Sequence, residues 1–162
     1  MNVEYFSHVP LLTAAASMTS GRVLELGSGL GSTLPLHGIC GAMKREIVTL
    51  DSDPEWLNMF TVYSRYWHTF KHVDSFENLP EYNEKWGMAF VDHGISLERG
   101  VSIEKLKDVP VIVVHDTCHP FLYGYEVLEN FKYRYDWKIK QPMTTVVSNT
   151  VDVREMFTKV GL

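Results

Sequence analysis

The chain has little cysteine, with only Cys40 and Cys118 among 162 residues. Two cysteines are too few for a disulfide framework, and this count is typical of proteins of the reducing cytoplasm, where we expect this one to reside. The sequence also lacks an apolar run long enough to cross a bilayer, so we expect no membrane partner. Its first residues lack the basic start and apolar stretch of a secretory signal.

Positive charge is scarce as well. Fifteen Lys and Arg residues stand against twenty Asp and Glu residues, which gives a formal net charge of -5. Such a balance disfavours binding to nucleic-acid phosphates, so we expect no nucleic-acid partner. Repeats, low-complexity tracts and linkers are also missing, and the length suits one domain over residues 1–162.

Strand and helix patterns alternate along this chain. Seven apolar or alternating segments predict strands, at residues 22–26, 45–50, 70–73, 86–91, 109–114, 133–140 and 144–153. Helices are expected at residues 7–18, from Thr33, from Pro54 and from Pro120. After Asp53 the apolar helix face would carry Trp56, Phe60, Tyr63 and Trp67, and after Pro120 it would carry Phe121, Tyr125, Leu128 and Phe131.

This alternation predicts an α/β fold, with one doubly wound, mainly parallel seven-stranded sheet and helices on both faces. Ligands of such folds bind beyond the carboxyl ends of the strands. The loops that follow the predicted strands are therefore the places to look for a site.

The first of these loops is rich in glycine. In "VLELGSGLGST" the glycines stand at Gly27, Gly29 and Gly31, with Glu25 just before them. The dinucleotide fingerprint G-x-G-x-x-G would place its third glycine where Ser32 stands. A carboxylate at Glu25 suits an ammonium group better than a pyrophosphate.

The pattern E-x-G-x-G-x-G resembles the first motif of class I S-adenosylmethionine (SAM)-dependent methyltransferases. The order of segments along nearly the whole chain is also similar to that of small methyltransferase-like proteins. The resemblance implies SAM as cofactor. Glu25 would then hold its methionine end, and the loop that also contains Ser28 and Ser32 would approach its sulfonium.

Two further strand ends complete the expected cofactor site. Asp51 ends the second strand, where a carboxylate can accept hydrogen bonds from both ribose hydroxyls, with Ser52 beside it. Asp53 is the better helix cap because Pro54 follows it. The resemblance implies that Asp74 or Ser75 lies at the adenine edge, although a capped turn explains these residues equally well.

The segment "WGMAFVDHGIS" resembles the fourth strand of the catechol O-methyltransferase-like group, and "VPVIVVHDT" resembles its fifth. The resemblance implies Mg²⁺ bound by Asp92, Asp116 and Thr117, although Thr117 stands where that group has Asn, and its catalytic lysine has no counterpart here. Without a metal, Asp92 or His93 would contact the cofactor, and Asp92, His93 or His115 would act as the base.

Three features near the fifth strand bear on the acceptor. The cluster His115, Asp116, Cys118 and His119 lacks the spacing of a structural zinc site, and packing and capping roles explain it better. Arg99 is either a surface residue or a ligand for an anionic acceptor group. Met143 lies in the loop between the last two predicted strands, which is expected to border the acceptor cleft.

The sequence therefore predicts a SAM-dependent methyltransferase that methylates an oxygen or nitrogen of a small molecule, with or without Mg²⁺, as a monomer or a homodimer. A methyltransferase-like SAM-binding sensor or partner subunit without transfer activity is the alternative. A nicotinamide oxidoreductase is disfavoured by the glycine spacing. A nucleic-acid methyltransferase is disfavoured by the acidic charge.

Overall fold

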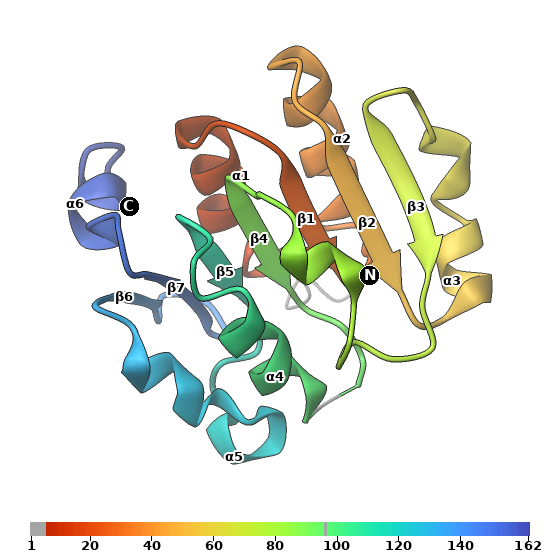
Figure 1. Cartoon of the computed structure of the whole chain (residues 1–162). Coiled ribbons are helices and arrows are strands. Elements are labelled where there is room, and N and C mark those ends of the chain that lie inside the picture. Colours follow the sequence, from red (N-terminus) through yellow and green to blue (C-terminus); the bar gives the residue numbers. More distant parts are fainter. Residues whose placement is uncertain (1–5, 96) are drawn as a thin grey trace.

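One seven-stranded sheet forms the centre of the protein (Figure 1). The computed structural model describes residues 6–95 and 97–162. The strands lie in the order β3-β2-β1-β4-β5-β7-β6. Their bounds are β1 Val23–Leu26, β2 Ile47–Asp51, β3 His68–His72, β4 Met88–Val91, β5 Ile112–Val114, β6 Tyr133–Trp137 and β7 Thr144–Ser148.

The first five strands are parallel, and β7 pairs antiparallel with both β5 and β6. The predicted α/β fold with a mainly parallel sheet is confirmed. The strand order reverses between β1 and β4, because the chain builds outward to β3 and then returns to the other side of β1. Such a switch point leaves a crevice beyond the carboxyl ends of the two central strands.

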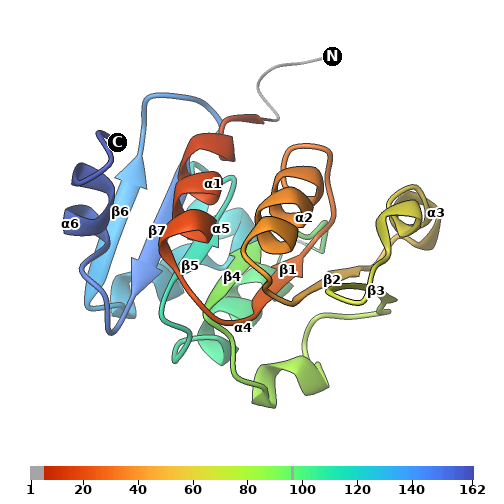
Figure 2. The ribbon, with the colours of Figure 1, turned by 90° about the horizontal axis from the view of Figure 1, so that it is seen from above.

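Helices cover both faces of the sheet (Figure 2). One face carries α1 (Val9–Met18), α2 (Thr33–Ala42) and α6 (Val153–Thr158), and the other carries α4 (Glu98–Lys105) and the 3-10 helix η4 (Tyr125–Asn130). The shorter elements are α3 (Pro54–Asn58), η2 (Thr61–Tyr63), η3 (Pro80–Asn83) and α5 (Pro120–Tyr123). None of the helices in the described ranges is long and apolar enough to cross a membrane.

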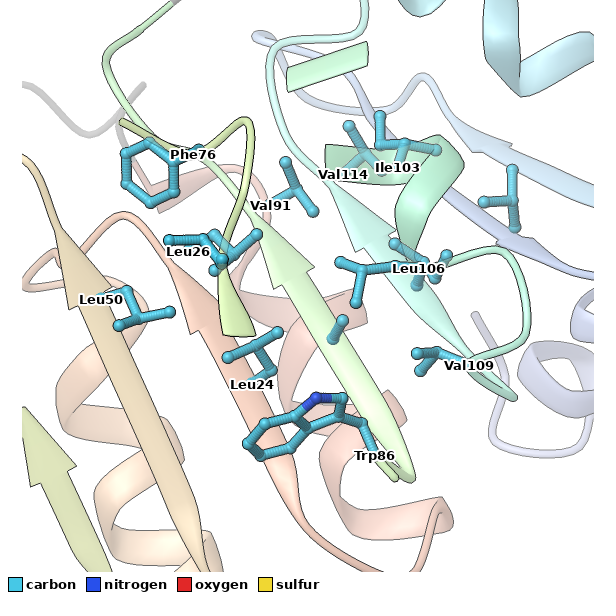
Figure 3. Close-up of a cluster of buried hydrophobic side chains, with 14 of the residues drawn as sticks. Leu24, Leu26, Leu50, Phe76, Trp86, Val91, Ile103, Leu106, Val109 and Val114 are labelled. Carbon is cyan, nitrogen blue, oxygen red and sulfur yellow. The ribbon is translucent and has the colours of Figure 1, made fainter. Parts of the chain in front are cut away.

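Side chains of each central strand alternate between two hydrophobic cores, because successive residues of a strand point to opposite faces. Figure 3 shows the core on the α4 face, with Leu24, Leu26 and Val91 from the sheet and Ile103 and Leu106 from the helix side. Met88 and Phe90 of β4 point instead toward α1 and α2. This alternation decides which way the residues just beyond each strand point.

Several sequence expectations were wrong in detail; the strand predicted at residues 133–140, for example, ends at Trp137. The helix after Asp53 is short: α3 ends at Asn58, and Arg65 pairs across a turn with His68, the first residue of β3. The helix after Pro120 ends at Tyr123, because Gly124 takes a left-handed φ of 67° before η4. The predicted strand 144–153 ends at Ser148, and Asp152 caps an unexpected α6 by accepting from the N–H groups of Arg154 and Glu155.

Candidate active site

The glycine loop joins β1 to α2 at the switch point. Gly27 has a φ of +94°, and a Cβ on it would lie 2.5 Å from the backbone oxygen of Asp92. Only glycine fits such a turn, where the backbones of β1 and β4 meet. A Cβ on Gly31 would instead meet Phe6 at 2.8 Å and the His8 ring at 3.2 Å. Segment 6–8 therefore packs directly against this loop.

Asp51 fastens the loop to the end of β2. Its Oδ2 accepts hydrogen bonds from the backbone N–H and the hydroxyl of Ser28, both at 2.6 Å, and its Oδ1 accepts from Asp53 N at 2.9 Å. Asp53 caps α3, as predicted, by accepting from the N–H groups of Glu55 and Trp56. The two nearby carboxylates thus have separate tasks.

Glu25 lies inside the protein rather than at the loop surface. Its Oε1 accepts from the Thr33 hydroxyl at 3.0 Å and its Oε2 from the Thr49 hydroxyl at 2.5 Å, and no part of it is exposed. Burial raises its pKa to about 7, although hydrogen bonds from Thr49, Ser32 and Thr33 oppose the rise. Thr33 also accepts from Gly29 N at 2.9 Å, so the carboxylate is linked to the loop through one hydroxyl.

The other predicted cofactor residues are placed less uniformly. Ser32 precedes α2 without capping it through its side chain, and Ser52 is half-buried beside Asp51. The Ser75 hydroxyl accepts from Glu77 N at 3.1 Å and donates to Glu98 at 3.1 Å, as in a capped turn. The Asp74 side chain is fully exposed.

Asp92 and His93 point to opposite faces of the sheet. His93 stacks on Phe76 with ring centroids 3.8 Å apart, and its Nε2 lies 3.1 Å from the Ser102 hydroxyl. Burial and the charge of Arg99 lower its pKa to about 3, so the ring is neutral at physiological pH. Asp92 points the other way, toward His115.

Arg99 binds both acids that were expected to hold Mg²⁺. Its Nη2 lies 3.1 Å from Asp92, and its Nη1 lies 3.5 Å from Asp116 and 3.0 Å from the Tyr125 hydroxyl. Its Nε donates to the His93 carbonyl at 2.6 Å. With 5% of its side chain exposed, Arg99 is not a surface residue, and its guanidinium is already paired.

The remaining predicted acceptor residues surround this group. Asp116 follows β5 with a φ of 58°, a conformation that non-glycine residues avoid and that is common at functional sites. The Thr117 hydroxyl lies 2.8 Å from that of Thr145, and its N–H donates to the Met143 carbonyl at 3.0 Å. The loop containing Met143 thus borders the ends of β4 and β5.

His115 connects the two strand ends to segment 6–8. Its Nδ1 lies 3.1 Å from Asp92 Oδ2, and its Nε2 lies 3.0 Å from the Ser7 hydroxyl. The ring of His8 packs edge-on against it, with centroids 4.4 Å apart. Burial opposes ionisation of Asp92, but hydrogen bonding to His115 and the charges of His115 and Arg99 outweigh it and lower the Asp92 pKa.

Comparison with known proteins gives a consistent result for the fold. No protein-family model and no curated protein sequence matches the chain. Among solved structures, the N-methyltransferase NodS from Bradyrhizobium japonicum is similar, with a TM-score of 0.62 and 12% identity over 91% of this chain and 96% of that one. A Staphylococcus aureus protein assigned as a caffeoyl-CoA O-methyltransferase has a TM-score of 0.62 and 10% identity, over 86% and 82%. The S-adenosylhomocysteine (SAH)-bound methyltransferase PaMTH1 from Podospora anserina has a TM-score of 0.60 and 14% identity, over 87% and 77%.

This chain has the class I methyltransferase fold. The sequence resemblance is therefore confirmed at the level of the fold. In open α/β sheets, ligands bind beyond the carboxyl ends of the strands at the switch point. Here that place holds Gly27, Gly29, Asp51 and Asp92.

The expected Mg²⁺ fits this methyltransferase fold poorly. Mg²⁺ prefers a set of free oxygen ligands. Asp92 and Asp116 each give one oxygen to Arg99, and their other oxygens face a ring nitrogen of His115, at 3.1 Å and 3.6 Å. The hydroxyl of Thr117 is hydrogen-bonded to Thr145, so no third oxygen ligand is free among these residues. We therefore derive no step through Mg²⁺.

Sequence reasoning missed Ser7, His8 and Tyr125 as members of the site. Ser7 and His8 lie more than a hundred residues from His115 in sequence, and neither belongs to a motif. Tyr125 was expected on a packing face, yet its hydroxyl donates to the His115 carbonyl at 2.7 Å. Strand alternation could have separated Asp92 from His93, because adjacent residues beyond a strand continue to point to opposite faces.

Proposed function

We propose that this chain transfers a methyl group from SAM to an oxygen or nitrogen of a small-molecule acceptor. One observation carries the proposal. At the switch point of a methyltransferase fold, Asp51 fastens the glycine loop, and a charged cluster at the ends of β4 and β5 lies on the acceptor side. The solved structures with this fold include N- and O-methyltransferases by name, and one was obtained with SAH.

Asp51 is the proposed ribose ligand. Its carboxylate already accepts from the Ser28 N–H and hydroxyl and from Asp53 N, which fixes its orientation before a ligand arrives. The loop glycines Gly27 and Gly29 leave room for the methionine part. Glu25 supports the loop through Thr33, and a direct contact to the ammonium group stays a prediction.

When bound, SAM supplies an electrophilic methyl group on a sulfonium sulfur. The chain's task is to align an acceptor lone pair with that methyl and to remove the acceptor's proton. His93 is unsuited to the proton transfer, because its ring is buried against Phe76 on the α4 face. The proposed place of acceptor activation is the pair Asp92 and His115, on the same face as α1.

The acceptor would enter between this pair and the loop before β7. Residues 138–141 of that loop are exposed, and Met143 is half-buried next to Thr117. The acidic net charge makes a small molecule a better acceptor than a nucleic acid. Homodimer formation and a cytoplasmic location stay predictions.

Calorimetry with SAM and SAH tests the first half of this proposal. We expect both to bind, and Asp51→Asn to weaken binding while Asp53→Asn, which alters only a helix cap, does not. Release of SAH in the presence of small hydroxyl and amine acceptors tests the second half. Binding without release of SAH by any acceptor would favour the sensor or partner-subunit alternative, and no binding at millimolar SAM would refute the proposal.

A further inference from the structure

Three side chains capable of binding a metal ion converge where segment 6–8 meets the ends of β4 and β5. One ligand atom from each of His8, Asp92 and His115 can be chosen so that all lie within 4.8 Å of one another. His8 and His115 are 3% exposed, and the Asp92 side chain is 23% exposed, so the cluster meets solvent mainly at Asp92. This combination of ligands differs from the all-oxygen set that the sequence suggested.

The hydrogen bonds of His115 bring two acceptor atoms together, its own Nδ1 and an oxygen of Asp92. The Ser7 hydroxyl donates to the Pro142 carbonyl at 2.6 Å, so it can only accept from His115 Nε2–H at 3.0 Å. In a neutral imidazole with its proton on Nε2, Nδ1 carries a lone pair. That lone pair faces the Asp92 carboxylate at 3.1 Å, and two acceptors at this distance need a positive centre between them.

The surroundings of His8 decide whether the positive centre between His115 and Asp92 is a proton or a metal ion. Both of its ring nitrogens are buried and lack a hydrogen-bond partner among the described residues. The Gly31 backbone lies close enough to influence the His8 pKa, but it does not reach hydrogen-bond geometry with either nitrogen. A proton on His115 would satisfy Asp92 and leave His8 unpaired. A metal ion would bind one nitrogen of His8 as well as Asp92 and His115.

We propose that His8, Asp92 and His115 bind a divalent transition-metal ion, with Zn²⁺ as the reference ion. Two imidazoles and one carboxylate suit Zn²⁺, Fe²⁺ or Co²⁺ rather than Mg²⁺. Three protein ligands leave a coordination position for water or an acceptor atom. The Ser7 hydroxyl, by accepting from Nε2–H, holds the His115 tautomer that presents Nδ1 to the ion.

The geometry and charge of the cluster agree with this assignment. Donor atoms on one tetrahedral ion stand about 3.4 Å apart when the bonds are about 2.1 Å, and the 3.1 Å between His115 and Asp92 is within a few tenths of an ångström of that. One nitrogen of His8 lies within 4.8 Å of both other ligand atoms. Asp92 uses its other oxygen for Arg99, so the ion and the guanidinium do not compete for the same atom.

Zn²⁺ itself is the probe for the test. The purified chain is stripped with a chelator, dialysed and titrated with Zn²⁺ by calorimetry, and Co²⁺ absorption reports the coordination geometry. We expect one Zn²⁺ per chain. Ser7→Ala should weaken binding about 10–100-fold, as loss of an outer-shell partner does, and His8→Gln should weaken it more. The exposed His119 offers a matched control, and His119→Gln should leave the affinity unchanged.

Ring resonances of the unmodified protein provide a second measurement that does not depend on a folded variant. Zn²⁺ should shift the signals of His8 and His115 together and leave those of His93 in place. Equal Zn²⁺ affinity in the unmodified chain and His8→Gln would overturn the proposal, as would loss of binding in His119→Gln alone or no binding at all. Calorimetry with SAM on the same samples separates failure of the metal site from failure of the proposed function, because neither Ser7 nor His8 belongs to the proposed cofactor site.

Discussion

Glu25 offers the sharpest quantitative prediction. Its carboxyl is fully buried, and its pKa is raised from the ordinary 4.5 to about 7. A raised pKa means that the folded protein binds this proton more tightly than the unfolded chain. The stabilisation is therefore complete below pH 4.5 and is lost as the pH rises through 7. At about 1.4 kcal/mol per pH unit, the loss amounts to about 3 kcal/mol.

Glutamine at this position stays neutral and can still pair with both hydroxyls, accepting from one threonine and donating to the other. Glu25→Gln should therefore match the unmodified protein near pH 4.5 and exceed its free energy of unfolding by about 3 kcal/mol at pH 8. Urea denaturation followed by tryptophan fluorescence, at several pH values and without cofactor, measures the difference. Glu77→Gln, at an exposed position, controls for the loss of one charge.

A stability difference between Glu25→Gln and the unmodified protein that stays flat from pH 5 to pH 8 would refute this reasoning. It would show that the carboxyl titrates near its ordinary value in the folded state. A difference of the opposite sign would mean that the ionised form is the better-bonded one, stabilised by the threonine hydroxyls beyond the cost of burial.

Four other substitutions test the local geometry. Gly27→Ala should lower the free energy of unfolding by at least about 3 kcal/mol, because its methyl would overlap the Asp92 backbone. Gly38→Ala in α2 meets nothing within 4 Å and should raise that free energy by up to about 1 kcal/mol. Chemical denaturation curves of the two variants measure both changes. Arg99→Met should cost about 2–4 kcal/mol, since two partly buried carboxylates lose their cation, and raising the salt concentration should not restore the melting temperature. Lys44→Gly should raise the free energy of unfolding by about 0.5 kcal/mol, because φ is 55° there, and an unchanged denaturation midpoint would contradict it.

The sheet could be predicted from the sequence because burial on both faces and the alternation of strands, loops and helices are local patterns. The prediction was wrong where the helical spacing of apolar residues alone was interpreted as a helix. Trp56 and Phe60 lie at helical spacing, yet the Trp56 indole donates to the Ser28 carbonyl while Phe60 is buried. Their regular spacing reflects two different partners rather than one continuous helix, and only the tertiary structure reveals this.

The candidate site was predictable in part. The glycine loop, Asp51 and the acids at the ends of β4 and β5 follow from where parallel strands end. The role of Arg99 could not be predicted, because it depends on how α4 folds back so that Arg99 contacts Asp92 just beyond β4. Ser7 and His8 were unpredictable from local pattern, since their significance depends on Pro142 and His115 at the other end of the chain.

The antiparallel direction of β7 has an evolutionary consequence. Because β7 runs against its neighbours, the loop that leads into it arrives at the same edge as the ends of β4 and β5. Lys138, Ile139, Lys140 and Gln141 of that loop are exposed and contribute nothing to the two cores. In the proposed methyltransferase, substitutions in this loop would change acceptor preference without disturbing either core, whereas the proposed cofactor site is constrained by packing. A directed-evolution library aimed at new acceptors should diversify this loop first.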